Sequence, residues 1–268
     1  MAAEIQPQPL IDHLVVLVSH ATLLKLPDQL QDSFVVAPGG THTGGATLNK
    51  LILFQDGFYV ELIAFAETVD PEKRKNHRWG RLEENQIIDF AYSLTDERDF
   101  KAVQQRVEQA GTPIRYSDPI AGGRTTDDGT VLKWAVAEAL DESRHELHPG
   151  KLPFWCLDRT PRKLRVPFQS DPEKTQHPSG ASGISSLSIT VDSRELGALS
   201  QVYDAIHDSH GSTNTWHFGI PSGDATAKHA LSLSGKDRAS GVTIVLRGNN
   251  SSPAKVEIVP GVIFELES

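Results

Sequence analysis

The sequence predicts an α+β fold made of repeated units, in which one strand is followed by a helix and then by further strands. Apolar runs of strand length begin near residues 10, 87 and 183, and each is followed by a helix-like segment and more apolar runs. Asp12 and Asp89 also occupy matching places just inside the first strand of the first two units. Such internal repetition is typical of folds that use one supersecondary module several times.

The first unit combines a leucine-rich helix with several apolar strands. Its expected elements are strands at 10–18, 34–36, 48–55 and 58–65 and a helix at 20–31. Leucines recur on one face of the helix, as in an amphipathic helix. Asp56-Gly57 separates the last two apolar runs, and an Asp-Gly pair in that place is a strong hairpin signal. The stretch Gly39–His42 is interpreted as a Gly-rich loop.

The second unit repeats this order with clearer helix boundaries. Thr95 is a plausible N-cap, acids follow it in the first turn, and Gly111 ends the helix. The expected strands are 87–94, 114–116, 130–137 and 152–158. Ala121–Gly129 is interpreted as a Gly- and Asp-rich loop, and the long polar segment Asp141–Gly150 as a lid.

A third unit follows a stretch rich in Pro, Ser and Gly. Strands are expected at 183–191, 230–234, 241–248, 255–260 and 262–266 and a helix at 193–207. The predicted domain organisation is a pair of units at 10–160, a linker at 161–183 and a third βαβββ-like unit at 184–268. An odd number of units means that the third pairs with part of the chain or with another subunit, so a homodimer is one option.

Composition excludes several classes of function. The chain has 268 residues, 38% hydrophobic and 23% charged, which is enough to bury a substantial core. A formal net charge of −9 argues against nucleic-acid or membrane partners and leaves a small molecule as the expected one. The basic run Arg159–Arg165 is interpreted as a solvated linker face or as a lure for an anionic substrate. We expect no nucleotide cofactor, because no phosphate-binding or dinucleotide motif is present.

The location of the protein is predicted from cysteine use and from the N-terminus. Cys156 is the single cysteine, so no disulfide can form within the chain. No basic segment followed by an apolar core marks a signal peptide at the start. We therefore expect a cytoplasmic protein in a reducing compartment.

Glu61 is the most informative candidate residue, because it lies in the apolar strand Tyr59–Ile63. A buried carboxylate needs a cation, a histidine or a hydrogen-bond donor, since removing it unpaired from water is costly. His13 lies in a similar apolar strand. The pair predicts a divalent metal site for Zn, Fe, Mn or Ni. The alternatives are a metal-free His13–Glu61 hydrogen bond, or two residues that lie apart.

Five further residues are candidates for catalysis or substrate contact. His42 is the titratable group of the Gly-rich stretch, and we interpret it as a base, an acid or a third ligand, with an exposed loop histidine as the alternative. Asn49 could orient a substrate oxygen or make a strand-edge hydrogen bond. Tyr59 shares the face of Glu61. Trp155 and His148 are candidate substrate contacts, with core packing and a solvated loop as their alternatives.

These residues resemble motifs of a known family. The matching pieces are Ile11-Asp12-His13-Leu14-Val15, Gly39-Gly40-Thr41-His42 with Thr47 and Asn49, Tyr59-Val60-Glu61-Leu62-Ile63, Leu152-Pro153-Phe154, and His177-Pro178 to Gly183. They are similar to the glyoxalase-like domain group of the vicinal oxygen chelate superfamily. The resemblance covers roughly residues 10–190.

The resemblance implies that βαβββ modules pair into an open, barrel-like mixed sheet with helices packed outside and a cupped interior. It also implies a metal held on the first and fourth strands of paired modules, which places His13 and Glu61 as ligands. The counterparts in the second unit are Phe90, or Asp89 after a shift of one residue, and Cys156 with Asp158 nearby. Phe90 cannot bind a metal, so the ligand set is incomplete in the sequence.

The resemblance and the residues together predict a lyase or isomerase that acts on a small oxygenated metabolite. In this hypothesis an enolate or oxyanion is stabilised in the cup, with metal assistance, and Glu61 or His42 transfers the proton. The alternative is a metal-free protein of the same fold that binds and sequesters a small molecule. A ring-cleaving dioxygenase is less favoured, because the sequence does not display two histidines and one carboxylate as a set.

Overall fold

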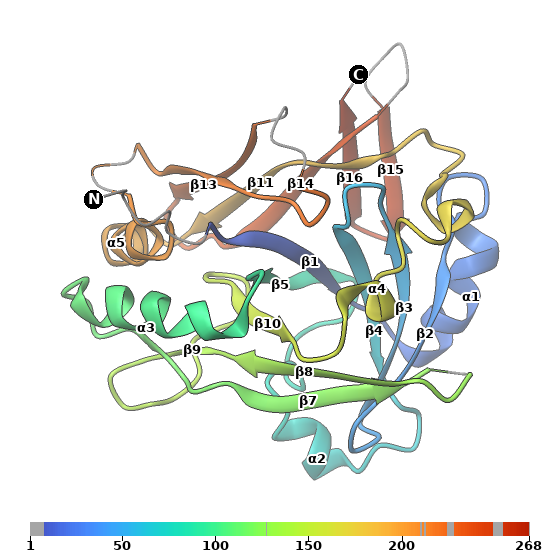
Figure 1. Ribbon diagram of the computed structural model, residues 1–268, viewed down its shortest axis with the longest axis horizontal. Coiled ribbons are helices and arrows are strands. Elements are labelled where there is room, and N and C mark those ends of the chain that lie inside the picture. Colours follow the sequence, from blue (N-terminus) through green and yellow to red (C-terminus); the bar gives the residue numbers. More distant parts are fainter. Residues whose placement is uncertain are drawn as a thin grey trace.

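The chain forms an eight-stranded barrel with a six-stranded sheet packed against its outside (Figure 1). This computed structural model describes residues 8–126, 128–209, 211, 213–223, 228–248 and 254–267. The predicted α+β class with repeated modules is confirmed. No helix among the described residues is long and apolar enough to cross a membrane.

Two consecutive modules build the barrel. The first consists of β1 (Leu10–Leu17), α1 (His20–Leu30), β2 (Ala37–His42), β3 (Thr47–Leu53) and β4 (Tyr59–Phe65). A short helix, α2 (Pro71–Lys75), follows it. The second module consists of β5 (Gln86–Ser93), α3 (Phe100–Gln109) with a 3₁₀ turn at Glu97–Asp99, β6 (Arg115–Tyr116), β7 (Ile120–Thr125), β8 (Val131–Ala137), β9 (Ala139–Leu140) and β10 (Phe154–Asp158).

The barrel closes in the order β1-β4-β3-β2-β7-β8-β10-β5. Each module pairs its first and last strands in parallel, β1 with β4 and β5 with β10, and an antiparallel β1–β5 pair joins the modules. The family resemblance implied an open sheet, and this detail was wrong. Two residue pairs close the sheet, Thr41 with Thr125 and His42 with Arg124, because the Gly-rich segments of both modules are strands.

Glycine in these segments permits close packing, although both segments were predicted to be loops. A Cβ on Gly39 would lie 2.0 Å from Oδ1 of Asn49, and one on Gly40 would lie 2.8 Å from the carbonyl oxygen of Thr125. In β7, a Cβ on Gly123 would lie 2.4 Å from the carbonyl oxygen of Leu132. Strands β2 and β7 therefore need glycine to approach their neighbours.

The predicted hairpin at Asp56-Gly57 is confirmed and has a second role. Strands β3 and β4 pair in antiparallel register, and Asp56 Oδ1 accepts a hydrogen bond from the Phe58 amide. Its other oxygen accepts from the amide of Ile184 and from Arg247 in the C-terminal sheet. Burial raises the pKa of Asp56 to about 6. This turn therefore ties the barrel to the second sheet.

A linker with the short helix α4 (Arg162–Arg165) and a 3₁₀ turn (Pro172–Thr175) leads to the C-terminal sheet. That part consists of β11 (Gly183–Val191), α5 (Leu196–Ile206), β12 (Thr215–Phe218), β13 (His229–Gly235), β14 (Gly241–Arg247), β15 (Ala254–Val259) and β16 (Val262–Glu267). The sheet order is β12-β13-β11-β14-β16-β15.

The C-terminal sheet repeats the centre of the barrel. Strands β11 and β13 are parallel, as β1 and β4 are, and β14 and β16 are parallel, as β5 and β10 are. An antiparallel β11–β14 pair joins the halves. Residues expected to form one third unit thus contain two shortened units that pair with each other, which answers the question of the odd unit.

One apolar core lies between the two sheets. Leu14 and Val16 of β1 belong to the same buried cluster as Leu187 and Ile189 of β11. The outer face of the barrel strands therefore packs on one face of the C-terminal sheet, with α1, α3 and α5 around them (Figure 1). The opposite face of β1, which carries His13, is left to line the barrel interior.

Candidate active site

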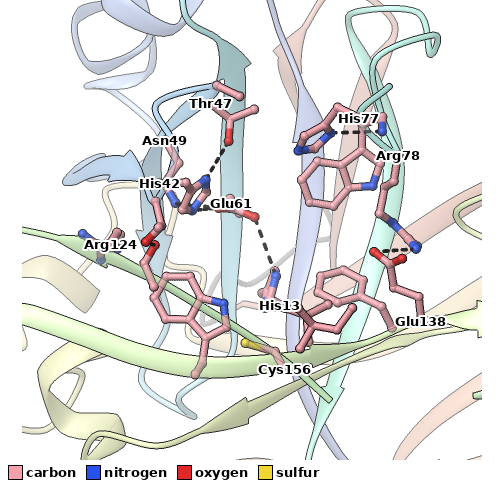
Figure 2. A pocket seen from close by; sticks show the side chains of 18 of the residues that line it. His13, His42, Thr47, Asn49, Glu61, His77, Arg78, Arg124, Glu138 and Cys156 are labelled. Atoms are coloured by element: carbon pink, nitrogen blue, oxygen red, sulfur yellow. Dashed lines mark hydrogen bonds and ion pairs between the residues drawn. The ribbon is translucent and has the colours of Figure 1, made fainter. Parts of the chain in front are cut away.

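The barrel interior holds a cavity of about 680 Å³. Its walls come from β1, β3 and β4 on one side and from β7, β8 and β10 on the other. The segment between β4 and β5 crosses one end and contributes Lys73 and the run Asn76–Trp79. Figure 2 shows the polar side chains of both walls facing this cavity.

His13 is held in one orientation by its neighbours. A register shift in β1 lies between Ile11 and His13, so Asp12 and His13 both avoid the outer core. The His13 Nδ1–H donates to Asp12 Oδ1 at 2.6 Å, and the ring stacks on Tyr59 with centroids 4.6 Å apart. Nε2 then points at Glu61, 3.7 Å from Oε2. The strand geometry thus presents an imidazole lone pair to the cavity.

Asp12 is kept ionised by the linker helix α4. Although burial opposes the charge, the guanidinium groups of Arg162 and Arg165 hold the pKa of Asp12 well below its usual value. Arg165 is 4% exposed and bonds Asp12, Asp158 and the Tyr59 hydroxyl. The basic run was expected to be a solvated face or a substrate lure. Arg162 and Arg165 of this run instead pair with the buried Asp12 and with the partly buried Asp158.

Glu61 lies at the centre of a hydrogen-bond network from three strands. Its Oε1 accepts from the Asn49 side-chain amide at 2.5 Å and lies 3.5 Å from Nε2 of His42. His42 Nδ1 lies 2.8 Å from Thr47 Oγ1, and Asn49 Nδ2 lies 3.3 Å from His42 Nε2. Burial lowers the pKa of His42, against the opposing effect of Glu61, so the ring is neutral near pH 7.

The ligand positions expected from the second module are engaged elsewhere. Asp89 binds Arg78, and Asp158 binds Arg162 and Arg165. Phe90 lies in the outer core, and Ala91 is opposite His13 in the barrel.

Cys156 also lines the cavity, but burial raises the pKa of its thiol. Ligand atoms of Asp12, His13 and Cys156 lie within 4.8 Å of one another. Both oxygens of Asp12 are already bound by arginine, however, so this trio is a poor metal site.

Sequence reasoning missed four charged residues of the cavity, which are Lys73, Arg78, Arg124 and Glu138. Arg78 and Glu138 form an ion pair with 3.2 Å between Nη1 and Oε1, and Arg124 donates from Nη1 to the Gly39 carbonyl. Asp89 gave a usable signal for Arg78, because a buried strand acid requires a cation nearby. Nothing comparable in the sequence points to Glu138, which follows β8 directly.

The predicted site residues divide into two groups. His13, His42, Asn49, Tyr59 and Glu61 all line the cavity.

Trp155 and His148 do not line the cavity. Trp155 points to the outer core, because successive residues of β10 alternate between faces. His148 is exposed in the segment 141–150, and no residue of that segment lines the cavity, so its expected role as a lid is not supported. The run from Asn76 to Trp79, between β4 and β5, lines the end of the cavity instead.

Comparison with known proteins adds a family and a fold. A family model described as a glyoxalase-like domain matches residues 11–205. A search of curated proteins finds no match. The fold is similar to that of a hypothetical protein from Staphylococcus aureus, which is 14% identical and aligns over 97% of this chain and 99% of that chain with a TM-score of 0.68.

Two further solved structures are more distant. A Mn(II)-bound glyoxalase from Novosphingobium aromaticivorans is 10% identical, with 97% of this chain and 82% of that chain covered and a TM-score of 0.49. The 2,3-dioxygenase LapB from Pseudomonas sp. KL28 is 8% identical, with 98% and 93% covered and a TM-score of 0.48.

Proposed function

The chain belongs to the glyoxalase-like domain family of the vicinal oxygen chelate superfamily, and from this premise we propose that its barrel cavity is the active site of a lyase or isomerase. The substrate class is a small oxygenated metabolite, and the central step is a proton transfer beside a carbonyl group. The observation that carries the proposal is the convergence of His13, His42 and Glu61 on one wall of the cavity.

The donor set of this wall fits a divalent metal. Nε2 of His13 lies 3.7 Å from one Glu61 oxygen, and Nε2 of His42 lies 3.5 Å from the other. Two imidazoles and one carboxylate suit Zn, Fe, Mn or Ni. Asp12 fixes the His13 tautomer that such binding requires. When bound, the metal would act as a Lewis acid toward neighbouring substrate oxygens.

The side chains divide the remaining work. Glu61 accepts the proton from substrate carbon, because it is the carboxylate that the wall presents to the cavity. Neutral His42 donates from Nδ1 to Thr47, which turns the lone pair of Nε2 toward the metal position beside Glu61. The Asn49 amide orients Glu61, and its Oδ1 is buried without a hydrogen bond among the described residues. Phe154 and Trp134 exclude water from the other side.

Elemental analysis of protein purified without chelator tests the metal. We expect one divalent metal per chain in the unaltered protein and its loss in His13→Ala and Glu61→Ala. His148→Ala is the matched control, since that histidine is exposed outside the cavity. A metal-free protein would contradict metal assistance. It would favour the metal-free binding protein, in which the Asn49 amide is the hydrogen-bond donor to Glu61.

One observation favours a second candidate, a metal-dependent oxygenase. Two histidines and one carboxylate lie together, a set that is typical of Fe(II) oxygenases. Oxygen uptake separates the two reactions, because an isomerase or lyase turns over without oxygen. Turnover of a 1,2-dicarbonyl hemithioacetal under nitrogen supports the leading proposal, whereas strict dependence on oxygen supports the second.

A further inference from the structure

Arg78 is fixed at the wall of the cavity opposite Glu61. Its Nε and Nη2 both donate to Asp89 Oδ2, at 3.0 and 2.5 Å. Asp89 is fully buried and also accepts from the Trp79 indole and the Gly150 amide. The Arg78 side chain is only 9% exposed. One edge of the guanidinium is therefore used for anchoring, and its position is determined before any ligand arrives.

The other edge of this guanidinium is incompletely satisfied. Nη1 lies 3.2 Å from Glu138 Oε1, but makes no hydrogen bond among the described residues. Figure 2 shows Arg78 and Glu138 side by side on the wall across from Glu61. A buried donor without a hydrogen bond is unfavourable, and an acceptor atom in the cavity would relieve this cost.

Glu138 is a replaceable partner for this donor. It shares Arg78 with Asp89, and the carboxylate of Glu146 also lies nearby. Burial raises the pKa of Glu138 to about 7, with Glu146 and Asp89 acting in the same direction and Arg78 opposing. Glu138 therefore gains a proton near neutral pH at little cost. A protonated Glu138 is itself a hydrogen-bond donor.

We propose that Arg78 Nη1 and Glu138 form a subsite for the carboxylate group of a small acid with an apolar body. The incoming carboxylate replaces the charge of Glu138, which takes up a proton, so the number of buried charges stays constant. Trp79 and Phe154 beside the subsite accommodate the apolar body. The cavity cations Lys73 and Arg124 add attraction for an anion. Only the identification of this acid as the substrate rests on the proposed function.

Calorimetry with phenylacetate, its neutral analogue phenylacetamide and the cation phenethylamine tests the subsite on the protein as purified. We expect phenylacetate to bind at least tenfold more tightly than either other probe. Affinity for phenylacetate should fall as pH rises through 7. Titrations in two buffers of different ionisation enthalpy should show proton uptake at pH 8 and much less at pH 6.

Variants locate the effect. Arg78→Lys and the charge-balanced pair Arg78→Gln with Asp89→Asn should each lose at least tenfold in phenylacetate affinity, with folding checked by circular dichroism. Glu138→Gln should bind phenylacetate without proton uptake and with little dependence on pH. Arg81→Gln, an exposed arginine of the same segment, is the matched control and should change nothing.

The assay requires neither turnover nor bound metal, so its failure is distinct from failure of the proposed function. Absence of phenylacetate binding, equal binding of phenylacetamide or a preference for phenethylamine would each overturn the subsite. The same holds if Glu61→Gln abolishes phenylacetate binding and the Arg78 variants do not, because the carboxylate would then lie at the opposite wall.

Discussion

The barrel and the C-terminal sheet share one arrangement of strands. They differ in the residues on the face that does not contribute to the core between them. Both are built around an antiparallel pair flanked by parallel neighbours. In the barrel, β2 and β7 extend and close the sheet, and the enclosed face carries His13 and Glu61. The C-terminal sheet stays open, and its free face carries small hydroxyl residues such as Ser188 and Ser232.

The closure of the barrel therefore explains why the candidate active site lies there and not on the C-terminal sheet. A carboxylate and two histidines on an open sheet are solvated and weakly coupled, whereas the same groups inside a closed barrel interact strongly. Buried charges in the barrel are also paired beneath the site, as Asp12 is with Arg165. We therefore expect the same type of substitution to reduce the free energy of unfolding more in the barrel than in the C-terminal sheet.

Removing a buried arginine of the barrel should have the largest effect. Arg165→Met leaves Asp12 without its innermost cation, and we expect a loss of about 3–5 kcal/mol in the free energy of unfolding. Arg194→Met is the matched control near the C-terminal sheet, because that arginine is 85% exposed and forms an exposed ion pair with nearby Asp192. Urea unfolding measures both. An equally small change in the two variants would contradict a structural role for the buried pair.

A methyl group at the barrel closure should have the next largest effect. Gly39→Ala places a Cβ against Asn49, so we expect a loss of roughly 2–3 kcal/mol from overpacking. In the C-terminal sheet, a Cβ on Gly241 meets nothing within 4 Å, and Gly241→Ala should leave the urea midpoint unchanged. If both variants behave alike, close packing at β2 is not what requires glycine there.

A smaller effect is expected from pH, through His177 of the linker. Its Nε2 bonds the Leu53 carbonyl, Nδ1 accepts from the Val35 amide, and burial lowers its pKa to about 4. Because the unfolded chain then binds more protons than the folded one below pH 6.5, acid reduces stability. The loss between pH 6.5 and 5.5 should be about 1 kcal/mol.

Urea unfolding at the two pH values checks this contribution. His177→Gln should remove it, whereas His148→Gln, at an exposed position, should retain it. An unchanged pH slope in His177→Gln would contradict the assignment.

The sequence was sufficient for the module plan and for part of the site. Glu61 and His13 stand out because a polar group in an apolar strand needs a partner, and that reasoning is local. His42 was found through its neighbouring glycines, although they form a strand and not a loop. Glycine has two uses, conformational freedom and close packing, and the sequence does not distinguish them.

The remaining features depend on contacts between distant segments. Arg78 contacts Glu138 only in the closed barrel. The linker arginines contact Asp12, although almost the whole sequence of the two barrel modules separates them. The two shortened units at the C-terminus were interpreted as one, because the sequence predicts no helix between the strands at 241–248 and 255–260. The second of these units is recognised from the parallel pairing of β14 with β16, and not from the order of helices and strands.

The central claim is that the first module alone supplies the metal ligands, with His42 as the third. Metal content of the unaltered protein, His42→Ala and Cys156→Ala, each purified without chelator, tests this most directly. The account predicts one divalent metal per chain, lost or strongly reduced in His42→Ala and retained in Cys156→Ala. Retention in His42→Ala together with loss in Cys156→Ala would contradict it and would assign the metal to the cluster of Asp12, His13 and Cys156.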